Sequence, residues 1–210
     1  MFFRTSPFFL KNISMKRIFD LFVSMVFTVL LSPVFLLTSL FIVINSGFPV
    51  FFTQKRVGKG GKQFTIFKFR TMTVLKEAKQ GSFDAGNSSR VTSVGKILRK
   101  TKIDELPQLI NVFKGNMSFV GPRPEVQKWV DAYPERWAVV HSVKPGITDN
   151  ASIIFRNEEE ILAASSNPTV TYRDEILPRK LDLYEDYVHT GNFKKDIGIL
   201  FKTFTSVLFK

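Results

Sequence analysis

The sequence contains no cysteine, which excludes disulfide bonds, a thiolate nucleophile and any cysteine metal site. Histidine is nearly as scarce: the two histidines, His141 and His189, stand far apart in the chain, which excludes a histidine-rich metal cluster. The phosphate-cradling pattern GxxxxGK[ST] is also absent. The cysteine- and histidine-dependent function classes are therefore excluded, and a phosphate loop is disfavoured.

Acidic residues are few, with 18 Asp and Glu against 30 Lys and Arg, and the formal net charge is +12. This excess points to an anionic partner, which can be nucleic acid, anionic lipid or a phosphorylated substrate. Tyrosine and tryptophan number only 4 and 2, whereas there are 23 phenylalanines. Many of these lie in apolar runs and are not interleaved with basic residues as on a base-stacking surface. The composition favours a membrane surface and predicts no nucleic-acid partner.

A long apolar run, residues 21–44, is uncharged and long enough to cross the hydrocarbon core of a bilayer. The run is too long for the apolar region of a signal peptide, and no A-x-A-like cleavage site follows it. A plain transmembrane helix is the remaining alternative. The 210 residues allow one domain with a sizeable core, or one domain with a membrane segment.

The pair Ser32-Pro33 lies in the middle of this run, where proline kinks or breaks a helix. Positive residues favour the cytoplasmic side of a membrane, and here they lie on both flanks. We therefore predict a re-entrant helix that turns at Ser32-Pro33, with Ser32 bonding freed carbonyls, and leaves on the side it entered. This gives a membrane-associated segment at 1–48 and a cytoplasmic domain at 49–210. The flanking basic residues are Arg4, Lys11, Lys16 and Arg17 before the run, and Lys55, Arg56, Lys59 and Lys62 after it.

The rest of the chain predicts an α+β fold that is mostly helical. Two β-prone runs in 50–72 flank Gly58 to Gly61 and favour a small hairpin over a phosphate loop. The other expected elements, in chain order, are a loop at 73–92, helices at 93–100 and from the Asp104-Glu105 pair to Gly115, a turn at 121–125, a helix at 125–140 interrupted at Pro134, a turn at 144–148, a strand at 151–155, a helix at 157–166 capped by Asn157, and a helix after Pro178. The basic, apolar segment 194–210 predicts either an interfacial helix on anionic lipid or a docking helix of the core.

The acidic pair Asp104-Glu105 stands in a basic neighbourhood. A helix cap with a first-turn glutamate is the ordinary interpretation, but capping needs only one carboxylate. Nearby lysines and arginines hold a carboxylate ionised at neutral pH, and a helix N-terminus also binds phosphate oxygens. An ionised carboxylate beside an anion pocket can act as a nucleophile toward phosphorus or as a ligand for Mg²⁺.

Two basic motifs are candidates for phosphate binding. Pro122 and Pro124 restrict the backbone around Arg123, whose guanidinium suits bidentate phosphate binding; the alternative is a surface arginine in a tight turn. Lys68 and Arg70 alternate along a predicted strand and share a face, which is either a phosphate-binding face or a solvated one.

Taken in order, the motifs KRIFD, the apolar run with Ser-Pro, PVFFTQKRVG, FKFRTM, LRKTKIDELPQLINVFKGNMSFVGPRPE and KPGIT resemble the bacterial sugar transferase family. The chain is similar to its small members, the monotopic polyprenyl-phosphate phosphoglycosyl transferases. The resemblance covers about residues 15–148, and the stretch 98–125 is the most specific part. One departure is Asp149, which follows KPGIT where the family commonly has glycine.

This resemblance implies a function at the cytoplasmic face of the bacterial inner membrane. Such enzymes move a phospho-sugar from a UDP-sugar to polyprenyl (undecaprenyl) phosphate and release UMP, as the first membrane step of bacterial glycan biosynthesis. It implies that Asp104 is the nucleophile of a covalent aspartyl-phosphosugar intermediate, that Glu105 holds Mg²⁺, and that Arg123 binds the donor's phosphates. The expected substrate-binding set also includes Lys68, Arg70, Arg99, Lys102 and Pro122.

Two other functions fit parts of the sequence. A UDP-releasing membrane glycosyltransferase would use similar donors, but the Asp-x-Asp metal motif that many such enzymes carry is absent. A non-catalytic membrane protein that binds anionic lipid explains the charge and the apolar run but leaves DELP and GPRP unexplained. Residues 149–190 are the least like the family pattern and are candidates for lining a sugar pocket. The sequence indicates no particular sugar, glycan pathway or oligomeric state.

Overall fold

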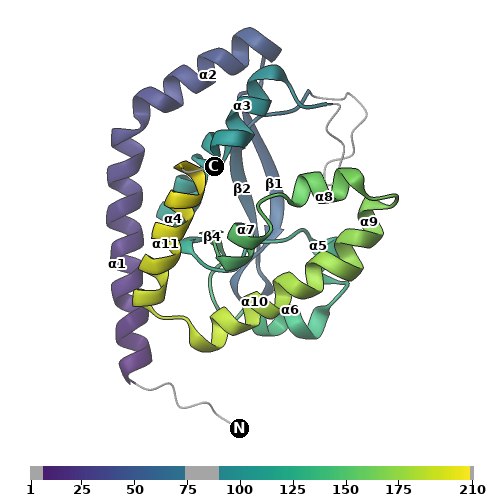
Figure 1. Cartoon of the computed structure of the whole chain (residues 1–210). Coiled ribbons are helices and arrows are strands. Elements are labelled where there is room, and N and C mark those ends of the chain that lie inside the picture. The colour runs from purple at the N-terminus through teal and green to yellow at the C-terminus, as the bar shows by residue number, and fades with distance from the viewer. Residues whose placement is uncertain (1–6, 74–89, 209–210) are drawn as a thin grey trace.

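The computed structural model describes residues 7–73 and 90–208. Most of the loop expected at 73–92, from residue 74 to 89, lies outside the described residues. The described fold is mostly helical, as predicted, with two small two-stranded sheets (Figure 1). The helices are α1 Pro7–Leu30, α2 Ser32–Ser46, α3 Ser93–Thr101, α4 Gln108–Lys114, α5 Gln127–Val130, α6 Pro134–Val140, α7 Asn150–Ile154, α8 Glu158–Ala164, α9 Pro168–Thr171, α10 Leu177–Thr190 and α11 Phe193–Leu208.

The long N-terminal helix breaks where the sequence predicts. α1 ends at Leu30, α2 begins at Ser32, and Pro33 occupies the first turn of α2, where its missing N–H costs little. In the part of the chain that the structure describes, no single helix is both long and apolar enough to cross a bilayer. Taken together, the two helical segments Met15–Leu30 and Ser32–Ser46 have the length and the apolar composition that crossing a bilayer requires, and they are bent by 59° at the break.

α1 packs along the body of the protein beside α4 and α11 (Figure 1). The Nζ of Lys16 lies 2.8 Å from Asp196 of α11. Arg17 donates a 2.7 Å hydrogen bond to the carbonyl of Val112, near the end of α4. Asp20 accepts from the Ser118 hydroxyl and from the next backbone N–H, both in strand β3 (Ser118–Val120). Buried polar contacts therefore join α1 to the rest of the chain.

The predicted hairpin is confirmed. Strands β1 (Phe51–Val57) and β2 (Gln63–Phe69) pair antiparallel, from Phe51 opposite Phe69 to Val57 opposite Gln63. The turn η1 (Lys59–Gly61) has φ values of 67° and 73° at its last two residues, Gly60 and Gly61, which glycine adopts without strain.

The expected turn at 144–148 is wrong in part, because β4 (Gly146–Thr148) pairs in parallel with β3. The backbones approach so closely that a Cβ on Gly146 would lie 2.1 Å from the nitrogen of Gly121. Parallel strands end at the same edge, so the residues after Val120 and those after Thr148 emerge side by side.

The expected strand at 151–155 is also wrong. These residues belong mainly to α7, because the carboxylate of Asp149 accepts a 2.8 Å hydrogen bond from the N–H of Ser152 and caps the helix. The helix expected at 157–166 is confirmed as α8, although Asn157 makes no side-chain capping bond among the described residues. The segment 125–140 forms α5 and α6, with the interruption at Pro134 as predicted.

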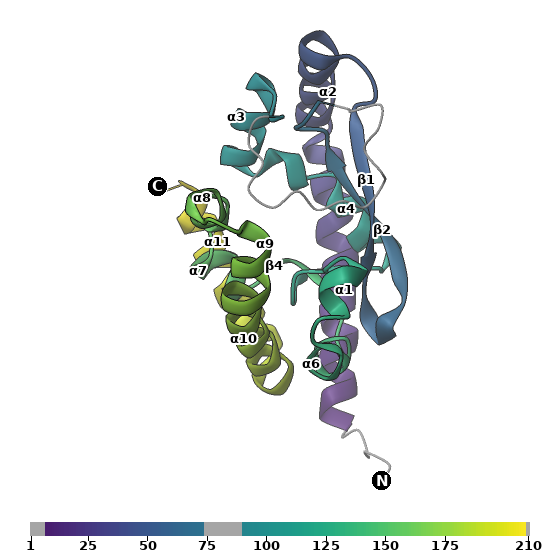
Figure 2. The same ribbon diagram turned by 90° about the vertical axis from the view of Figure 1, so that its right-hand side faces the viewer.

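The largest buried cluster lies mainly between α5, α6 and α10, and it includes Val57 at the end of strand β1. Figure 2 shows α10 on the side of the molecule opposite the hairpin. The large aromatic members of the cluster are Trp129, Trp137, Tyr172 and Tyr184, all nearly fully buried. Tyr172 begins a π-helical turn, η3 (Tyr172–Ile176), that leads into α10.

α11 docks on the body through one face. Ile199 is buried, and Thr203 hydrogen-bonds Thr148 at the end of β4. The opposite face exposes Phe201 and Phe204, which are 69% and 63% accessible. The docking interpretation of the C-terminal segment is confirmed for one face only.

Candidate active site

The acidic pair occupies a short turn between two helices. α3 ends at Thr101, and Lys102, with φ 59°, reverses the chain direction. Asp104 and Glu105 then lie in one 3₁₀ turn, η2 (Ile103–Glu105), before Pro107. α4 begins only at Gln108, and no described side chain caps its start. Asp104 and Glu105 are therefore first-turn residues of η2 and do not cap α4, which begins later than predicted, whereas the predicted end at Gly115 is confirmed.

Glu105 is fixed by two basic residues from different parts of the chain. Lys68 of β2 places its Nζ 2.8 Å from Oε1. Arg123 donates to both carboxylate oxygens, at 3.3 Å to Oε2 and by a shorter contact to Oε1. Burial by itself raises the pKa of Glu105, but Arg123 and Lys68 outweigh it and hold that pKa well below its usual range. Glu105 is therefore ionised at neutral pH.

Asp104 has the opposite environment. Its side chain is buried, and no described residue hydrogen-bonds its Oδ1. Burial raises the pKa of Asp104 above its ordinary value; Lys68 opposes this effect, and the charge of Glu105 adds to it. The basic neighbourhood holds Glu105 ionised as expected, but at Asp104 burial outweighs it. Oδ1 of Asp104 thus has no hydrogen-bond partner among the described residues and lies beside a fixed anion, and a carboxylate oxygen of this kind can act as a nucleophile.

The backbone around Arg123 is restrained on both sides. The N–H of Gly146 donates a 3.0 Å hydrogen bond to the carbonyl of Pro122, and Arg56 donates to the carbonyl of Pro124. The charge of Glu105 raises the pKa of Arg123 well above its usual value, so the guanidinium stays positive. Both flanking prolines are buried, and the Arg123 side chain remains 29% exposed. The exposed part can meet an anionic ligand.

The other predicted binding residues divide into two groups. Lys68 lies in the site, and the charge of Lys102 acts on Asp104, lowering its pKa. Arg99 instead bonds Thr71 and Glu159, each at 3.0 Å.

Arg70 also has partners elsewhere. Its guanidinium donates to the carbonyls of Ser46, Gly47 and Phe48, at the end of α2. Lys68 therefore contacts the acidic pair, whereas Arg70 binds the carbonyls at the end of the apolar helix pair and does not lie in the site.

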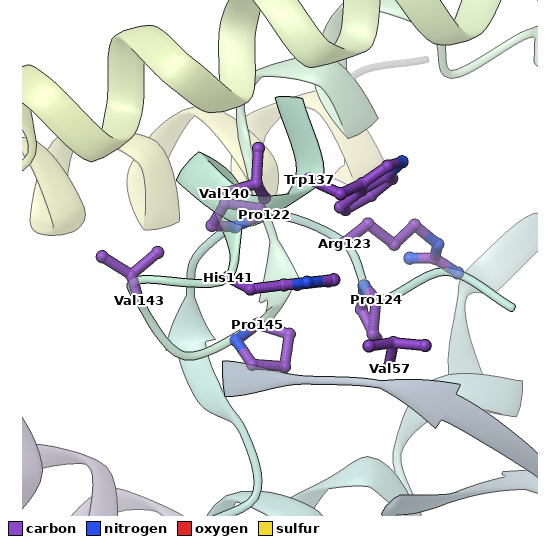
Figure 3. Close-up of a pocket in the computed structure, with 9 residues that line it drawn as sticks. All are labelled: Val57, Pro122, Arg123, Pro124, Trp137, Val140, His141, Val143 and Pro145. Atoms are coloured by element: carbon purple, nitrogen blue, oxygen red, sulfur yellow. The ribbon is translucent and has the colours of Figure 1, made fainter. Parts of the chain in front are cut away.

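A small pocket lies behind the GPRP turn (Figure 3). The His141 ring stacks on Trp137 at 5.2 Å between centroids, and burial lowers the pKa of His141. Figure 3 shows the guanidinium of Arg123 directed away from this imidazole. The pocket is lined by Val57, Pro122, Arg123, Pro124, Trp137, Val140, His141, Val143 and Pro145.

Sequence reasoning missed Asp149 as a neighbour of the site. β3 and β4 end at one edge, so Arg123 and Asp149 follow parallel neighbours, and the charge of Asp149 raises the pKa of Arg123. The departure from the family's glycine after KPGIT was the only signal in the sequence.

The site thus combines a carboxylate oxygen that has no hydrogen-bond partner among the described residues with a second carboxylate held by Lys68 and Arg123. The chain belongs to the bacterial sugar transferase family, whose sequence model matches residues 11–210. The match extends well past residue 148, where the motifs become less specific.

Three relatives illustrate the similarity. The chain is 36% identical over 198 residues to the UDP-N-acetylgalactosamine-undecaprenyl-phosphate N-acetylgalactosaminephosphotransferase of Aeromonas hydrophila, covering 92% of this chain and 43% of that protein. It is 41% identical over 196 residues to the UDP-glucose:undecaprenyl-phosphate glucose-1-phosphate transferase of Klebsiella pneumoniae, covering 91% and 40%. It is 38% identical over 194 residues to the uncharacterized sugar transferase EpsL of Bacillus subtilis, covering 92% and 87%. The chain thus spans less than half of the first two proteins.

Proposed function

We propose that this protein transfers a phospho-sugar from a UDP-sugar to undecaprenyl phosphate, or a similar polyprenyl phosphate, and releases UMP. The observation that carries the proposal is the asymmetry of the acidic pair: Glu105 is held by Lys68 and Arg123, while no described residue bonds Oδ1 of Asp104. The names of the Aeromonas and Klebsiella relatives support both the donor class and the acceptor.

The first step uses the free carboxylate oxygen of Asp104. This oxygen attacks the sugar-bearing phosphorus of the UDP-sugar, and the bond from that phosphorus to the bridging oxygen breaks. UMP leaves with the bridging oxygen and its electron pair, and the enzyme keeps an aspartyl-phosphosugar intermediate.

The second step regenerates the free carboxylate of Asp104. A phosphate oxygen of the polyprenyl phosphate attacks the same phosphorus, and the bond to Asp104 breaks. The product is a polyprenyl diphosphate sugar, and the carboxylate leaves ionised. Two steps let one site receive a soluble donor first and a lipid acceptor second.

The basic residues supply charge and position. Phosphoryl transfer depends mainly on positioning and on neutralising the charge spread over the phosphate oxygens. Arg123 and Lys68 are fixed by Glu105 before the donor arrives, so little side-chain freedom is lost on binding. Lys102 adds positive charge beside Asp104.

Mg²⁺ fits this donor set only together with phosphate. The described residues contain no group of three or more Asp, Glu, His or Cys side chains that could hold a metal. Mg²⁺ is commonly held by one or two carboxylates, substrate phosphates and water. Glu105 would hold it together with phosphate oxygens of the donor, which leaves Oδ1 of Asp104 for the attack on phosphorus. A bound Mg²⁺ would offset the charge of the diphosphate.

The helix pair supports a re-entrant segment at 1–48 that forms one functional unit with a cytoplasmic domain at 49–210. The side chains of Phe22, Val29, Leu36 and Ile44 are 62–73% exposed, which suits lipid and not water. The 59° bend, the packing of α1 on α4 and the ion pair of Lys16 in α1 with Asp196 in α11 support entry and exit on one side. The site then lies at the cytoplasmic face of the inner membrane.

The exposed face of α11 supports the same placement. Phe201 and Phe204 project from a helix that also carries Lys194, Lys195 and Lys202. Such a helix can lie at the boundary between headgroups and acyl chains, where anionic lipid attracts its lysines.

Nucleotide release tests the function. The purified protein is incubated with Mg²⁺, undecaprenyl phosphate and a panel of UDP-sugars, and UMP and UDP are assayed separately. We expect UMP, with turnover that requires the lipid acceptor. UDP release would indicate a glycosyltransferase, and release of neither nucleotide with any sugar would favour a lipid-binding protein; both outcomes would overturn the proposal.

A further inference from the structure

The carboxylate of Glu125 lies two residues after Arg123 but faces the interior. It is 5% exposed and lies at the end of the GPRPE turn. The NH1 of Arg56 donates a 3.1 Å hydrogen bond to its Oε2, and its Oε1 accepts from the hydroxyl of Tyr172 through a short contact. A buried carboxylate held from both sides is fixed in orientation.

The same partners also fix the backbone that carries Arg123. The N–H of Val57 donates a 2.9 Å hydrogen bond to the carbonyl of Glu125, and Arg56 reaches the carbonyl of Pro124. Only rigid Pro124 separates Glu125 from Arg123. Any movement of the Glu125 side chain and backbone is therefore transmitted to the turn from which Arg123 reaches Glu105.

Tyr172 is itself held firmly. Its ring packs against Trp129, with centroids 4.9 Å apart, and Nζ of Lys180 lies 5.2 Å from its ring centroid. Lys180 in turn pairs with Glu158 of α8 at 2.5 Å. Tyr172 begins the π-helical turn η3, and such turns are frequent at functional sites.

We infer that Tyr172 is a positioning residue for phosphate binding, acting through Glu125 to hold Arg123 against the diphosphate of the donor. The inference rests on the proposed function and adds a residue to it. Burial raises the pKa of Tyr172 well above its usual value, so its hydroxyl remains a donor at physiological pH. The segment 149–190, which the sequence marked as unlike the family pattern, thereby contributes to phosphate binding.

The test compares two tyrosines whose hydroxyls bond different turns, the GPRPE turn for Tyr172 and η3 for Tyr133. Tyr172→Phe removes the hydroxyl that bonds Glu125. Tyr133→Phe removes a hydroxyl that donates to the carbonyl of Arg173 at 3.0 Å, in η3, without touching Glu125. Steady-state UMP release is measured for both variants in the wild-type background and in an Arg123→Lys background, and their melting temperatures are recorded.

We expect Tyr172→Phe to lower kcat/KM about tenfold, less than the roughly 10²-fold cost of a full 1 Å misplacement, because Arg56 and Val57 still hold the turn. We expect KM for the UDP-sugar to rise more than kcat falls. In the Arg123→Lys background the same change should cost little more, since the residue it positions is already altered. Tyr133→Phe should keep kcat/KM within about twofold of the wild-type value, because it removes a hydrogen bond that stabilises η3 without altering the GPRPE turn.

Three results separate the possible failures. Equal kcat/KM for Tyr172→Phe and Tyr133→Phe, with active wild type, would overturn the inference alone. A full tenfold loss in the Arg123→Lys background would also overturn it, because the effects would be independent. No UMP release by wild type would overturn the proposed function and this inference with it. If Tyr172→Phe does not fold, Glu125→Gln replaces it, with the same outcomes expected.

Discussion

Arg123 and Glu105 form a two-pronged ion pair between the GPRP turn and the turn that carries the acidic pair. Oδ1 of the adjacent Asp104, in contrast, has no hydrogen-bond partner among the described residues. Since the two acids are neighbours in sequence, their different roles arise from the residues that the fold places beside each of them.

Arg123→Lys tests the need for a planar, two-pronged donor. Lysine keeps the charge but cannot donate along two parallel bonds, so we expect kcat/KM to fall about 10- to 100-fold, the range for one lost charge-assisted hydrogen bond. Arg179→Lys, at an exposed position on α10, is the matched control. A variant at Arg123 that equals this control in UMP release would contradict the assigned role.

Glu105 gives a pH dependence of stability with a defined sign. Its folded-state pKa lies well below the ordinary glutamate value of 4.5, so the unfolded chain binds the proton more readily. The stability it contributes is present above the unfolded pKa and is lost as pH falls through the folded pKa. We expect Glu105→Gln to reduce the acid-induced fall in the free energy of unfolding, measured by denaturant titration between pH 7 and roughly pH 3.

The raised pKa of Asp104 predicts a pH dependence of stability with the opposite sign, which serves as an internal comparison. Burial raises its pKa above 3.8, so the folded state holds this proton more readily than the unfolded chain does. Its contribution grows as pH falls through the folded pKa, and Asp104→Asn should make the acid-induced loss steeper. Parallel curves for Asp104→Asn and Glu105→Gln would contradict the environments assigned to the pair.

Asp196→Asn tests the connection of α1 to α11. Asp196 is buried and receives Lys16 at 2.8 Å and the Tyr187 hydroxyl at 2.8 Å. Loss of its charge leaves Lys16 without its ion-pair partner, so we expect a loss of about 1–3 kcal/mol in stability. Asp186→Asn, on the exposed surface of α10, should change the melting temperature little. Equal melting temperatures for Asp196→Asn and Asp186→Asn would show that the contact between Asp196 and Lys16 does not anchor α1.

The break at Ser32-Pro33 predicts membrane topology. If the helix pair re-enters, an N-terminal reporter tag and a C-terminal one should both be labelled from the cytoplasmic side. Opposite labelling would show that the pair spans the membrane. The Pro33→Leu variant restores the missing N–H and should move a fraction of the molecules to the spanning arrangement.

The features that the sequence predicted correctly depend on local patterns. The break at Ser32-Pro33, the hairpin around Gly58 to Gly61 and the end of α4 at Gly115 each follow from the conformational limits of proline or glycine nearby. The acidic pair was identified because adjacent carboxylates in a basic stretch exceed what a helix cap requires.

The features that it predicted wrongly depend on side-chain capping or on contacts between distant residues. Ile153 and Ile154 favour a strand by propensity, but the cap at Asp149 and the packing of the segment produce a helix. The strand Gly146–Thr148 exists only because β3 lies beside it. The placement of Arg70 at the end of α2 likewise follows from the path of the chain after the helix pair.

The covalent intermediate on Asp104 tests the central claim most directly. The wild-type protein is incubated with each UDP-sugar and Mg²⁺ without lipid acceptor, quenched, and examined by intact-mass and peptide mass spectrometry. We predict a phosphosugar adduct on Asp104 and one equivalent of UMP per active site, with neither in Asp104→Asn and both unchanged in the exposed control Glu160→Gln. An adduct on another residue, or UMP release by Asp104→Asn near the wild-type level, would contradict the account.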